Sequence, residues 1–297
     1  MSTTNIQNIK WNTRQRLNYI EVKAFYTGVV SRSDVAQTFA MSDPAATKDL
    51  KLYNDLAPKN LIYKQSEFGF IPNPDFSPIL STLAPALGLN LIMQNTPSQW
   101  LATEGAPIYG IAAEGLPQPL RLPSKEIVSN ITRAIFQGKK LSIHYASLSE
   151  RGDGLTRLIE PHSLVNTGVR WHVRAYNEDS FDFRDFVLSR MLDAKLSDEA
   201  AESSQEYDEE WMESIDLKLS PHPQLSAQQQ LNILADYSED GTRIEFSLRR
   251  ALIGYVLNAL SVDTTEDQSL NPNAHPLVLL NRDEIEIYAQ WALEKNE

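Results

Sequence analysis

The residues with the clearest chemical potential lie in one short run of the chain, GVRWHVRAY at 168–176. Apolar and polar side chains alternate in it, which is typical of a β-strand with one buried face. The other face carries Arg170, His172, Arg174 and Tyr176. Because an unpaired buried cation is costly, such a cluster is either open to water or binds an anion. The planar guanidinium of arginine matches phosphate and carboxylate, so the strand predicts an anion site.

Neighbouring runs extend this candidate site, because they carry further arginines and a tyrosine. The added candidates are Tyr145, Arg157, Arg184 and Arg190. If His172 lines the site, it adds a charge that depends on pH. The alternative is ordinary salt bridging of the arginines with nearby acids, namely Glu160, Asp179, Asp182, Asp185 and Asp193.

Short strands are the elements that must position these residues. The two-residue period begins at Leu141, and glycines separate the runs, so residues 139–197 are expected to form a small β-barrel. Residues 198–216 contain nine acids and no base, which predicts a solvated helix face or linker. Beyond them, a strand-like TRIEFSLRR, a helical ALIGYVLNAL and a closing HPLVLLN predict an α/β unit.

The first 72 residues predict three helices followed by a hairpin. Ser31 and Ser42 can cap the second and third helices, and Pro58 ends the third. LIYKQSEFGFIP at 61–72 has two aromatic and β-branched runs about a polar turn, which indicates a hairpin. This element order is a winged helix-turn-helix, whose third helix can enter the major groove of DNA.

The third helix separates a core face from a basic face. Its apolar stripe is Ala46, Leu50, Tyr53 and Ala57, at spacings of four, three and four. Cations on the opposite face can neutralise phosphates, and a short polar side chain there can approach a base edge. With the start of the second helix and the wing added, the DNA-binding candidates are Arg32, Ser33, Ser42, Thr47, Lys48, Lys51 and Lys64. Taken singly, any of these lysines could instead be a solubilising surface charge.

The formal net charge of -12 conceals a basic head. Residues 1–70 hold nine Lys and Arg against six Asp and Glu, whereas residues 196–297 hold six against 21. Charge read by segment therefore allows DNA binding by the head. A length of 297 residues predicts two or three folding units. Cysteine is absent, and neither a membrane span nor a secretory leader is visible, so we expect a cytoplasmic, nucleoid-associated protein.

The sequence offers no constellation for catalysis. The motifs GxxxxGK[ST], GxGxxG, HExxH and GxSxG are all missing. The five histidines are scattered, and the acids of residues 198–216 lack the apolar setting that would raise a pKa. We therefore expect neither an enzyme nor a cofactor or metal site.

The chain resembles a family of regulators. Residues 143–191 resemble the WYL domain in the order of Tyr145, Arg157, the Trp171 strand and a closing Arg-x-Phe at Arg184. The head, residues 31–72, is similar to that of the WYL regulators of the BrxR and CapW type, which are linked to phage-defence islands. His172 and Val173 replace the usual Tyr and Leu, so the effector of relatives does not transfer at that position.

The resemblance implies an α+β protein of several domains. These are a winged helix at 1–72, a helical, proline-rich connector at 73–138, an Sm/SH3-like WYL barrel at 139–197, and an acidic linker with a C-terminal α/β dimerisation domain at 198–297. It implies a homodimeric repressor that binds a palindromic double-stranded operator of a phage-defence operon. An anionic effector at the WYL domain, such as a nucleic acid or nucleotide, would relieve repression. The alternative is a single-stranded nucleic-acid-binding module that uses the arginine-rich barrel.

Overall fold

The computed structural model describes residues 6, 9–94, 109–111, 113, 122–148, 155–238 and 240–293. The chain divides into two compact units, residues 1–116 and 117–297. Within the described residues, no helix is long and apolar enough to cross a membrane.

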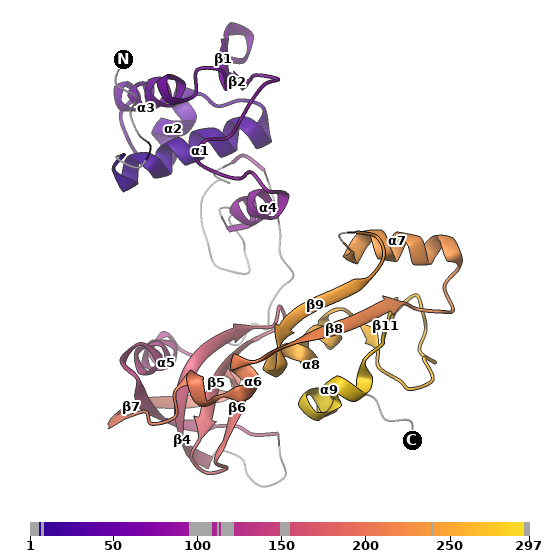
Figure 1. Cartoon of the computed structure of the whole chain (residues 1–297). Coiled ribbons are helices and arrows are strands. Elements are labelled where there is room, and N and C mark those ends of the chain that lie inside the picture. The colour runs from indigo at the N-terminus through magenta and orange to yellow at the C-terminus, as the bar shows by residue number, and fades with distance from the viewer. Residues whose placement is uncertain are drawn as a thin grey trace. The chain divides into compact units, whose positions relative to one another are not determined.

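Three helices build the core of the first unit, and a fourth follows the wing (Figure 1). They are α1 (Trp11–Thr27), α2 (Arg32–Thr38), α3 (Asp43–Leu56) and α4 (Pro85–Gln94). A reciprocal capping box between Ser31 and Asp34 begins α2. The apolar stripe expected on α3 is confirmed, because its four members, Ala46, Leu50, Tyr53 and Ala57, are all buried.

A β-hairpin, the wing, follows α3 and is anchored just before α2. Strands β1 (Leu61–Lys64) and β2 (Gly69–Pro72) pair antiparallel across one turn of 3-10 helix, η2 (Gln65–Glu67). The Val30 N–H donates to the Phe70 carbonyl at 2.9 Å, and the Phe70 N–H donates back at 2.8 Å. A Cβ on Gly69 would lie 2.7 Å from the Val29 side chain, so this close approach requires glycine. The wing therefore has a fixed direction.

Glu21, in the middle of α1, ties the segment after the wing to the helices. Its side chain is fully buried and accepts a hydrogen bond from the Tyr53 hydroxyl at 2.9 Å. The backbone N–H groups of Ile79, Leu80 and Ser81 also donate to it, at 2.8–3.0 Å. These four donors compensate the burial of the carboxylate.

An antiparallel sheet covered by one helix forms the first half of the second unit. Its strand order is β6-β5-β4-β3-β7. The elements are α5 (Lys125–Gln137), β3 (Lys139–Tyr145), β4 (Leu155–Asn166), β5 (Trp171–Asn177), β6 (Asp182–Val187) and β7 (Met191–Ala200). The apolar face of α5, which carries Ile127, Ile131 and Ala134, packs in the same core as Leu141 and Val173 of the sheet. The core therefore lies between helix and sheet.

This sheet is open, whereas the sequence predicted a closed barrel. Strands β6 and β7 are its edges, and no ladder among the described residues joins them. A 3-10 turn, η3 (Leu188–Arg190), separates the two strands, and β3 and β4 each contain register shifts that bend the sheet. Because α5 already covers the apolar face, burial of the core does not require closure.

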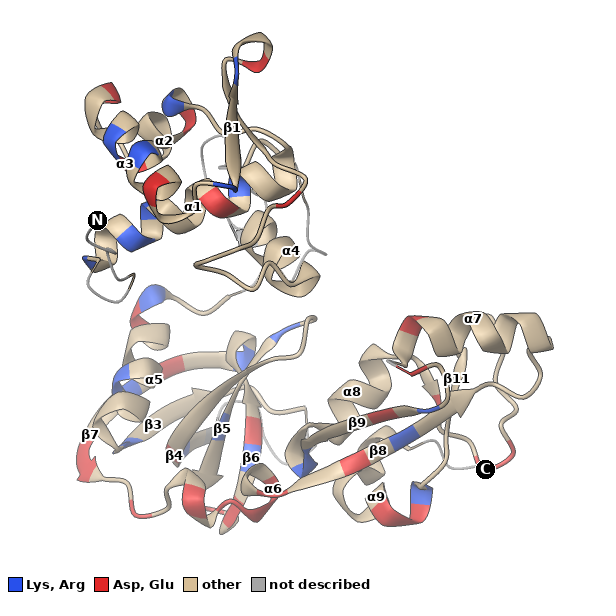
Figure 2. Cartoon of the chain, turned by 45° about the horizontal axis from the view of Figure 1, so that its top comes forward, with Lys and Arg blue, Asp and Glu red and all other residues tan. Residues whose placement is uncertain are grey.

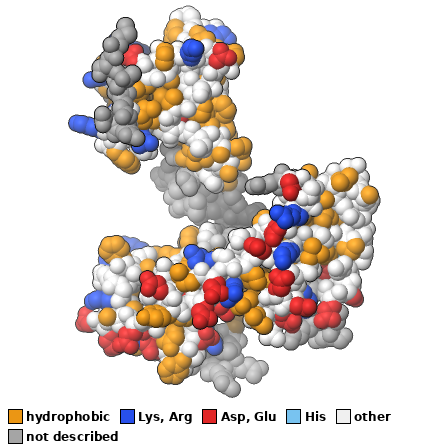
Figure 3. Space-filling view, in the orientation of Figure 1, with side chains coloured by type: hydrophobic (Ala, Val, Ile, Leu, Met, Phe, Trp, Pro, Cys, Tyr) orange, Lys and Arg blue, Asp and Glu red, His pale blue; other side chains and the backbone are white. Residues whose placement is uncertain are grey.

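A second sheet, of order β10-β11-β8-β9, forms the rest of this unit. Its elements and the turns that precede it are η4 (Gln205–Tyr207), α6 (Glu209–Met212), β8 (Ser214–Pro221), α7 (Ala227–Tyr237), β9 (Ile244–Arg249), η5 (Arg250–Leu252), α8 (Ile253–Ala259), β10 (Val262–Asp263), β11 (Leu277–Leu279), α9 (Arg282–Ala289) and η6 (Gln290–Ala292). Leu217, Ile253 and Ile285 are central to its core. Figure 3 shows acidic side chains scattered over this unit, in keeping with its acidic composition.

Candidate nucleic-acid interface and arginine cluster

A groove of about 700 Å³ lies between α3 and the wing. Four of the seven DNA-binding candidates line it, namely Arg32, Ser33, Thr47 and Lys51. The wing contributes aromatic residues, among them Tyr63 and Phe68. The structure thus brings together residues that are far apart in the sequence, on one side of the first unit.

Ion pairs within the first unit decide which cations a ligand can reach. Arg16 of α1 is held by the buried Asp49 through a 2.6 Å contact, so it serves the fold. Lys48 and Lys51 are exposed and form no ion pair with any residue that the structure describes. Figure 2 shows basic positions along α3. This helix therefore presents two uncommitted cations to solvent.

The other candidate cations of the head have partners. Arg32 lies 3.2 Å from Asp43, and Lys64 lies 3.3 Å from Glu67. All four side chains are about half exposed, so these pairs hold their cations weakly. Lys64 lies on the wing but does not line the groove between wing and helix.

The hydroxyl candidates occupy helix ends and one helix face. Ser42 is the N-cap residue of α3, but its side chain makes no capping hydrogen bond. The Thr47 hydroxyl donates to the Asp43 carbonyl at 2.9 Å, and Ser33 accepts from Gln37 at 3.3 Å. Both contacts are exposed, so a ligand can replace them.

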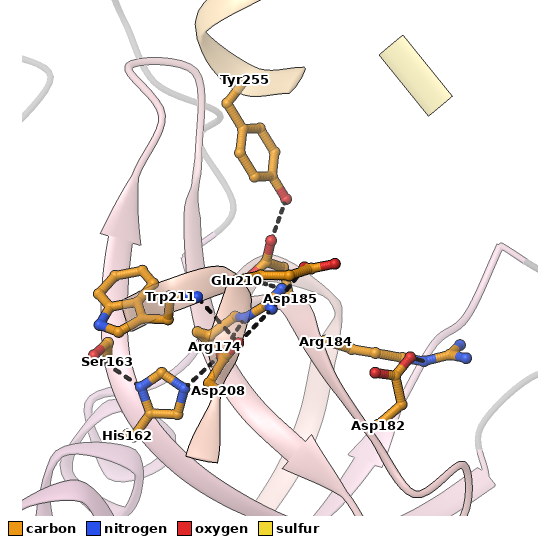
Figure 4. Close-up of polar contacts among 10 residues, drawn as sticks. All are labelled: His162, Ser163, Arg174, Asp182, Arg184, Asp185, Asp208, Glu210, Trp211 and Tyr255. Carbon is orange, nitrogen blue, oxygen red and sulfur yellow. Dashed lines mark hydrogen bonds and ion pairs between the residues drawn. The ribbon is translucent and has the colours of Figure 1, made fainter. Parts of the chain in front are cut away.

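Carboxylates of the chain itself surround one arginine of the predicted anion cluster, Arg174. Arg174 is buried, and its Nε and Nη2 donate to the two oxygens of Asp208 at 2.7 and 3.0 Å. A third hydrogen bond, at 3.0 Å, goes to Glu210, and Asp185 lies 3.8 Å away (Figure 4). Of the acids named above as salt-bridge partners, Asp185 is the one that lies next to Arg174, and Asp182 pairs with Arg184 instead. We call this ion-pair cluster of Arg174, Asp185, Asp208 and Glu210 the Arg174 cluster.

Tyr255 of α8 connects the second sheet to the Arg174 cluster. Its hydroxyl donates to Asp185 at 2.9 Å (Figure 4). Its ring lies 5.1 Å from that of His172 and 5.1 Å from that of Trp291. Burial raises the pKa of Asp185, and the charge of Arg174 offsets only part of this effect. The polar face of β5 is thus covered by α8 and α6.

Ser163, His162 and Asp208 form a hydrogen-bonded row that has the composition of a catalytic triad. His162 lies 3.0 Å from the Ser163 hydroxyl and 3.1 Å from Asp208. Asp208, however, is neutralised by Arg174, so it is not free to stabilise an imidazolium. Trp211 also packs against the His162 ring, at 5.5 Å. The row fixes the segment around Asp208 on the sheet.

The remaining anion candidates lie apart from this ion-pair cluster. The Arg157 guanidinium lies 5.8 Å from the centre of the Tyr145 ring, and the Tyr145 hydroxyl accepts from the Val187 N–H. Arg184 of β6 has an exposed side chain that lies 3.6 Å from Asp182. Arg157, Arg170 and Arg190 form no ion pair with any described residue.

His172 is buried, and its Nδ1 has no hydrogen-bond partner among the described atoms. Burial, together with the charges of Arg170 and Arg190, lowers the pKa of His172 to about 4. The imidazole is therefore neutral at pH 7, with two cations nearby. An anion bound to these arginines would remove part of the electrostatic cause of that neutrality.

Replacing His172 with glutamine should flatten the dependence of stability on pH. Between about pH 6.5 and pH 4 the unfolded chain binds a proton at His172 that the folded chain excludes. The free energy of unfolding should therefore fall by about 3 kcal/mol as the pH drops through this window. Urea unfolding of both proteins at pH 7.5 and pH 4.5 measures the difference. An unchanged pH effect in His172→Gln would contradict this assignment, and His144→Gln on β3 is the matched control.

Sequence reasoning missed Asp208, Glu210 and Tyr255 as members of the cluster. Asp208 and Glu210 were assigned to a solvated acidic run, yet Asp208 is only 1% exposed. Within residues 139–197 the acids outnumber the arginines, so charge balance gave no signal that a partner would come from outside this segment. Tyr255 carried no signal, because it lies in an apolar helix 70 residues beyond Asp185.

Comparisons with known proteins match all three parts of this architecture. Residues 12–93 match the BrxR transcriptional regulator winged helix-turn-helix domain, 126–196 the WYL domain, and 214–285 the BrxR transcriptional regulator C-terminal dimerization domain. The chain is 32% identical to the DNA-binding transcriptional repressor CapW of Escherichia coli (strain KTE188), over 94% of this chain and 92% of the relative.

Proteins of the same name in two further bacteria agree with this match. That of Stenotrophomonas maltophilia is 28% identical over 100% of this chain and 98% of its own, and that of Pseudomonas aeruginosa is 30% identical over 96% and 94%. These relatives are regulators, which confirms the expectation that the protein is not an enzyme. The chain belongs to the CapW family of DNA-binding transcriptional repressors.

Proposed function

We propose that this protein is a homodimeric repressor that binds a palindromic duplex operator through the groove between α3 and the wing. We assign operator binding to residues 1–72, effector binding to residues 139–197, and dimerisation to residues 198–297. The repressed genes are proposed to form a phage-defence operon, and the protein to act in the cytoplasm at the nucleoid. An anionic effector at the sensor would relieve repression.

The groove carries the DNA-binding part of this proposal. The uncommitted Lys51 and the short Thr47 line it from α3, and both are exposed, whereas Leu50 lies buried at its wall. Arg32 and Ser33 lie at the start of α2, where they suit contacts with the phosphate backbone. Dimer symmetry then sets the half-sites about one helical turn apart, or a multiple of it.

The sensor part rests on the residues that the chain's own carboxylates leave unpaired. Arg157, Arg170 and Arg190 are uncommitted, and the buried Nδ1 of His172 lacks a partner. Arg174 could contribute only after an anion displaced Asp208 and Glu210. Phosphate groups of a nucleotide or an oligonucleotide fit this chemistry. A screen in which no such compound altered operator affinity would refute this part.

The alternative, a module for single strands, finds less support. Stacking would need an exposed aromatic on the arginine-rich strand, yet Trp171 is half-buried against the core of the sheet and Arg174 is buried. Single-stranded oligonucleotides nevertheless belong in the first binding experiment as a competing ligand.

The test is a gel-shift titration of the full chain against the duplex upstream of its own gene. A scrambled duplex and the two separated strands serve as controls, and each titration is run at two salt concentrations. Selective binding of the native duplex that weakens with salt supports the proposal. Equal binding of all duplexes, or preference for single strands, would overturn it.

Lys51→Ala should weaken operator binding about five- to tenfold and reduce the magnitude of the salt slope by about one, because a phosphate contact is lost. Leu50 next to it is buried, but Lys51 is exposed, so the melting temperature should not change. The matched control is Lys125→Ala, an exposed lysine that lies outside the groove. An unaltered affinity in Lys51→Ala would remove Lys51 from the interface.

A further inference from the structure

The tip of the wing presents an exposed aromatic ring in an unusual backbone conformation. Phe68 ends the 3-10 turn in the left-handed region, with φ 50 and ψ 28, which a phenylalanine rarely adopts. Its side chain is 76% exposed, so no burial in the chain compensates this conformation. An exposed large apolar group on a strained backbone indicates a site of interaction.

The wing does not supply a surplus of positive charge. Between Asn60 and Pro72 the charged residues are Lys64 and Glu67, which pair with each other at 3.3 Å. Glu67 lies directly before Phe68 and would repel a phosphate. The tip therefore offers DNA an aromatic surface and uncharged polar groups, but no free positive charge.

The base of the wing fixes the backbone that carries this ring. The paired hydrogen bonds between Val30 and Phe70 anchor β2, and Gly69 packs tightly against Val29. Phe68 immediately precedes Gly69, and it shares the groove with Lys51 and Arg32. When α3 lies in the major groove, Phe68 faces the DNA beside that helix, because both line one groove of the protein.

We propose that Phe68 is an apolar wedge that enters the minor groove of the operator and bends the duplex. This inference rests on the proposed binding of duplex DNA. Apolar side chains in the minor groove partly unstack a base step and kink the duplex towards the major groove. Easily unstacked steps, such as TA and CA, are then favoured at positions that α3 does not contact. Phe68 thus determines specificity through the deformability of DNA.

The experiment compares four full-length proteins on circularly permuted duplexes that carry the bound upstream sequence. These are the native chain, Phe68→Asn, Phe68→Leu and Phe136→Asn. Asparagine tolerates the left-handed region, so Phe68→Asn should melt at the same temperature as the native chain or higher. Leucine retains an apolar wedge. Phe136 of α5 is 91% exposed and controls for the loss of a surface phenyl ring.

The native chain and Phe136→Asn should bend the duplex equally. Phe68→Asn should abolish most of the bend and weaken binding about tenfold with an unchanged salt slope, because no phosphate contact is lost. Phe68→Leu should retain most of the bend and most of the affinity of the native chain. Improved or equal folding with impaired binding excludes a purely structural role for the ring.

Three outcomes would overturn the inference. They are a native complex without a bend, a bend that Phe68→Asn leaves unchanged, and a loss of affinity accompanied by a smaller salt slope. The last would show that the ring only positions Lys64. Failure of the proposed function is distinguishable, because the native chain would then not bind the duplex selectively at all.

Discussion

Arg174→Met should lower the free energy of unfolding of the second unit by about 3–5 kcal/mol. Methionine fills a similar volume, so the loss comes from charge and not from a cavity. Asp208 is 1% exposed, and it would keep only the contacts from His162 and the Trp211 N–H. Leaving a buried carboxylate without its cation is among the costliest single changes in a protein.

Urea unfolding followed by tryptophan fluorescence measures this loss, because Trp171, Trp211 and Trp291 all lie in the second unit. The matched control is Arg184→Met. Arg184 and its partner Asp182 are more than half exposed, so the control should lose less than about 1 kcal/mol. Equal losses in both variants would show that the Arg174 cluster contributes no more than a surface pair.

The same cluster predicts how stability responds to acid. Burial alone would raise the pKa of Asp208, but the hydrogen bonds from His162 and Arg174 outweigh it and hold the pKa at about 2. The folded pKa therefore lies below the unfolded value. The stabilisation is fully present well above about pH 4 and is lost as the pH falls towards 2. Arg174→Met should weaken this acid dependence.

Glu21→Ala should destabilise the first unit by about 3–5 kcal/mol, because its four donors lose their common acceptor. Glu21→Gln should restore only part of the lost stability. Its amide has one acceptor oxygen, and its NH2 group would face N–H groups that also donate. Glu67→Ala, at an exposed carboxylate in the wing, should change stability by less than about 0.5 kcal/mol.

Hydrogen exchange localises the effect of Glu21→Ala. The amides of Ile79, Leu80 and Ser81 bond to this carboxylate, so they should lose protection first. Amides in the centre of α3 should exchange only when the whole unit unfolds. Retained protection at residues 79–81 in Glu21→Ala would mean that other contacts hold this loop.

The head could be predicted from sequence because its information is local. The spacing of Ala46, Leu50 and Tyr53 indicates a buried helix face without any long-range knowledge, and all three are buried. Glu21 shows the limit of such reasoning. It lies among the apolar positions of α1, where a charged residue is not expected. Its backbone partners are almost 60 residues away and follow no periodicity, so the sequence does not reveal them.

The polar face of β5 was harder to predict because its partners come from outside the sheet. Alternation along β5 correctly separates Val173 from Arg174, but both are buried, one by α5 and the other by the acidic segment. The counterion of Arg174 is Asp208, which lies 34 residues later in the chain, and no local sequence pattern indicates that the two residues meet. Closure of the sheet failed as a prediction for a similar reason, since it depends on pairing between β6 and β7, the two edge strands.

The position of Asp208 also limits where recombination can join segments of two such regulators. A recombinant that joined a foreign sheet at residue 197 to the rest of this chain would keep Asp208 and Glu210 but lose Arg174, and so would bury Asp208 without its cation. A junction after Trp211 would transfer the arginine with its counterions. The sheet and the acidic segment that follows it must therefore be exchanged together.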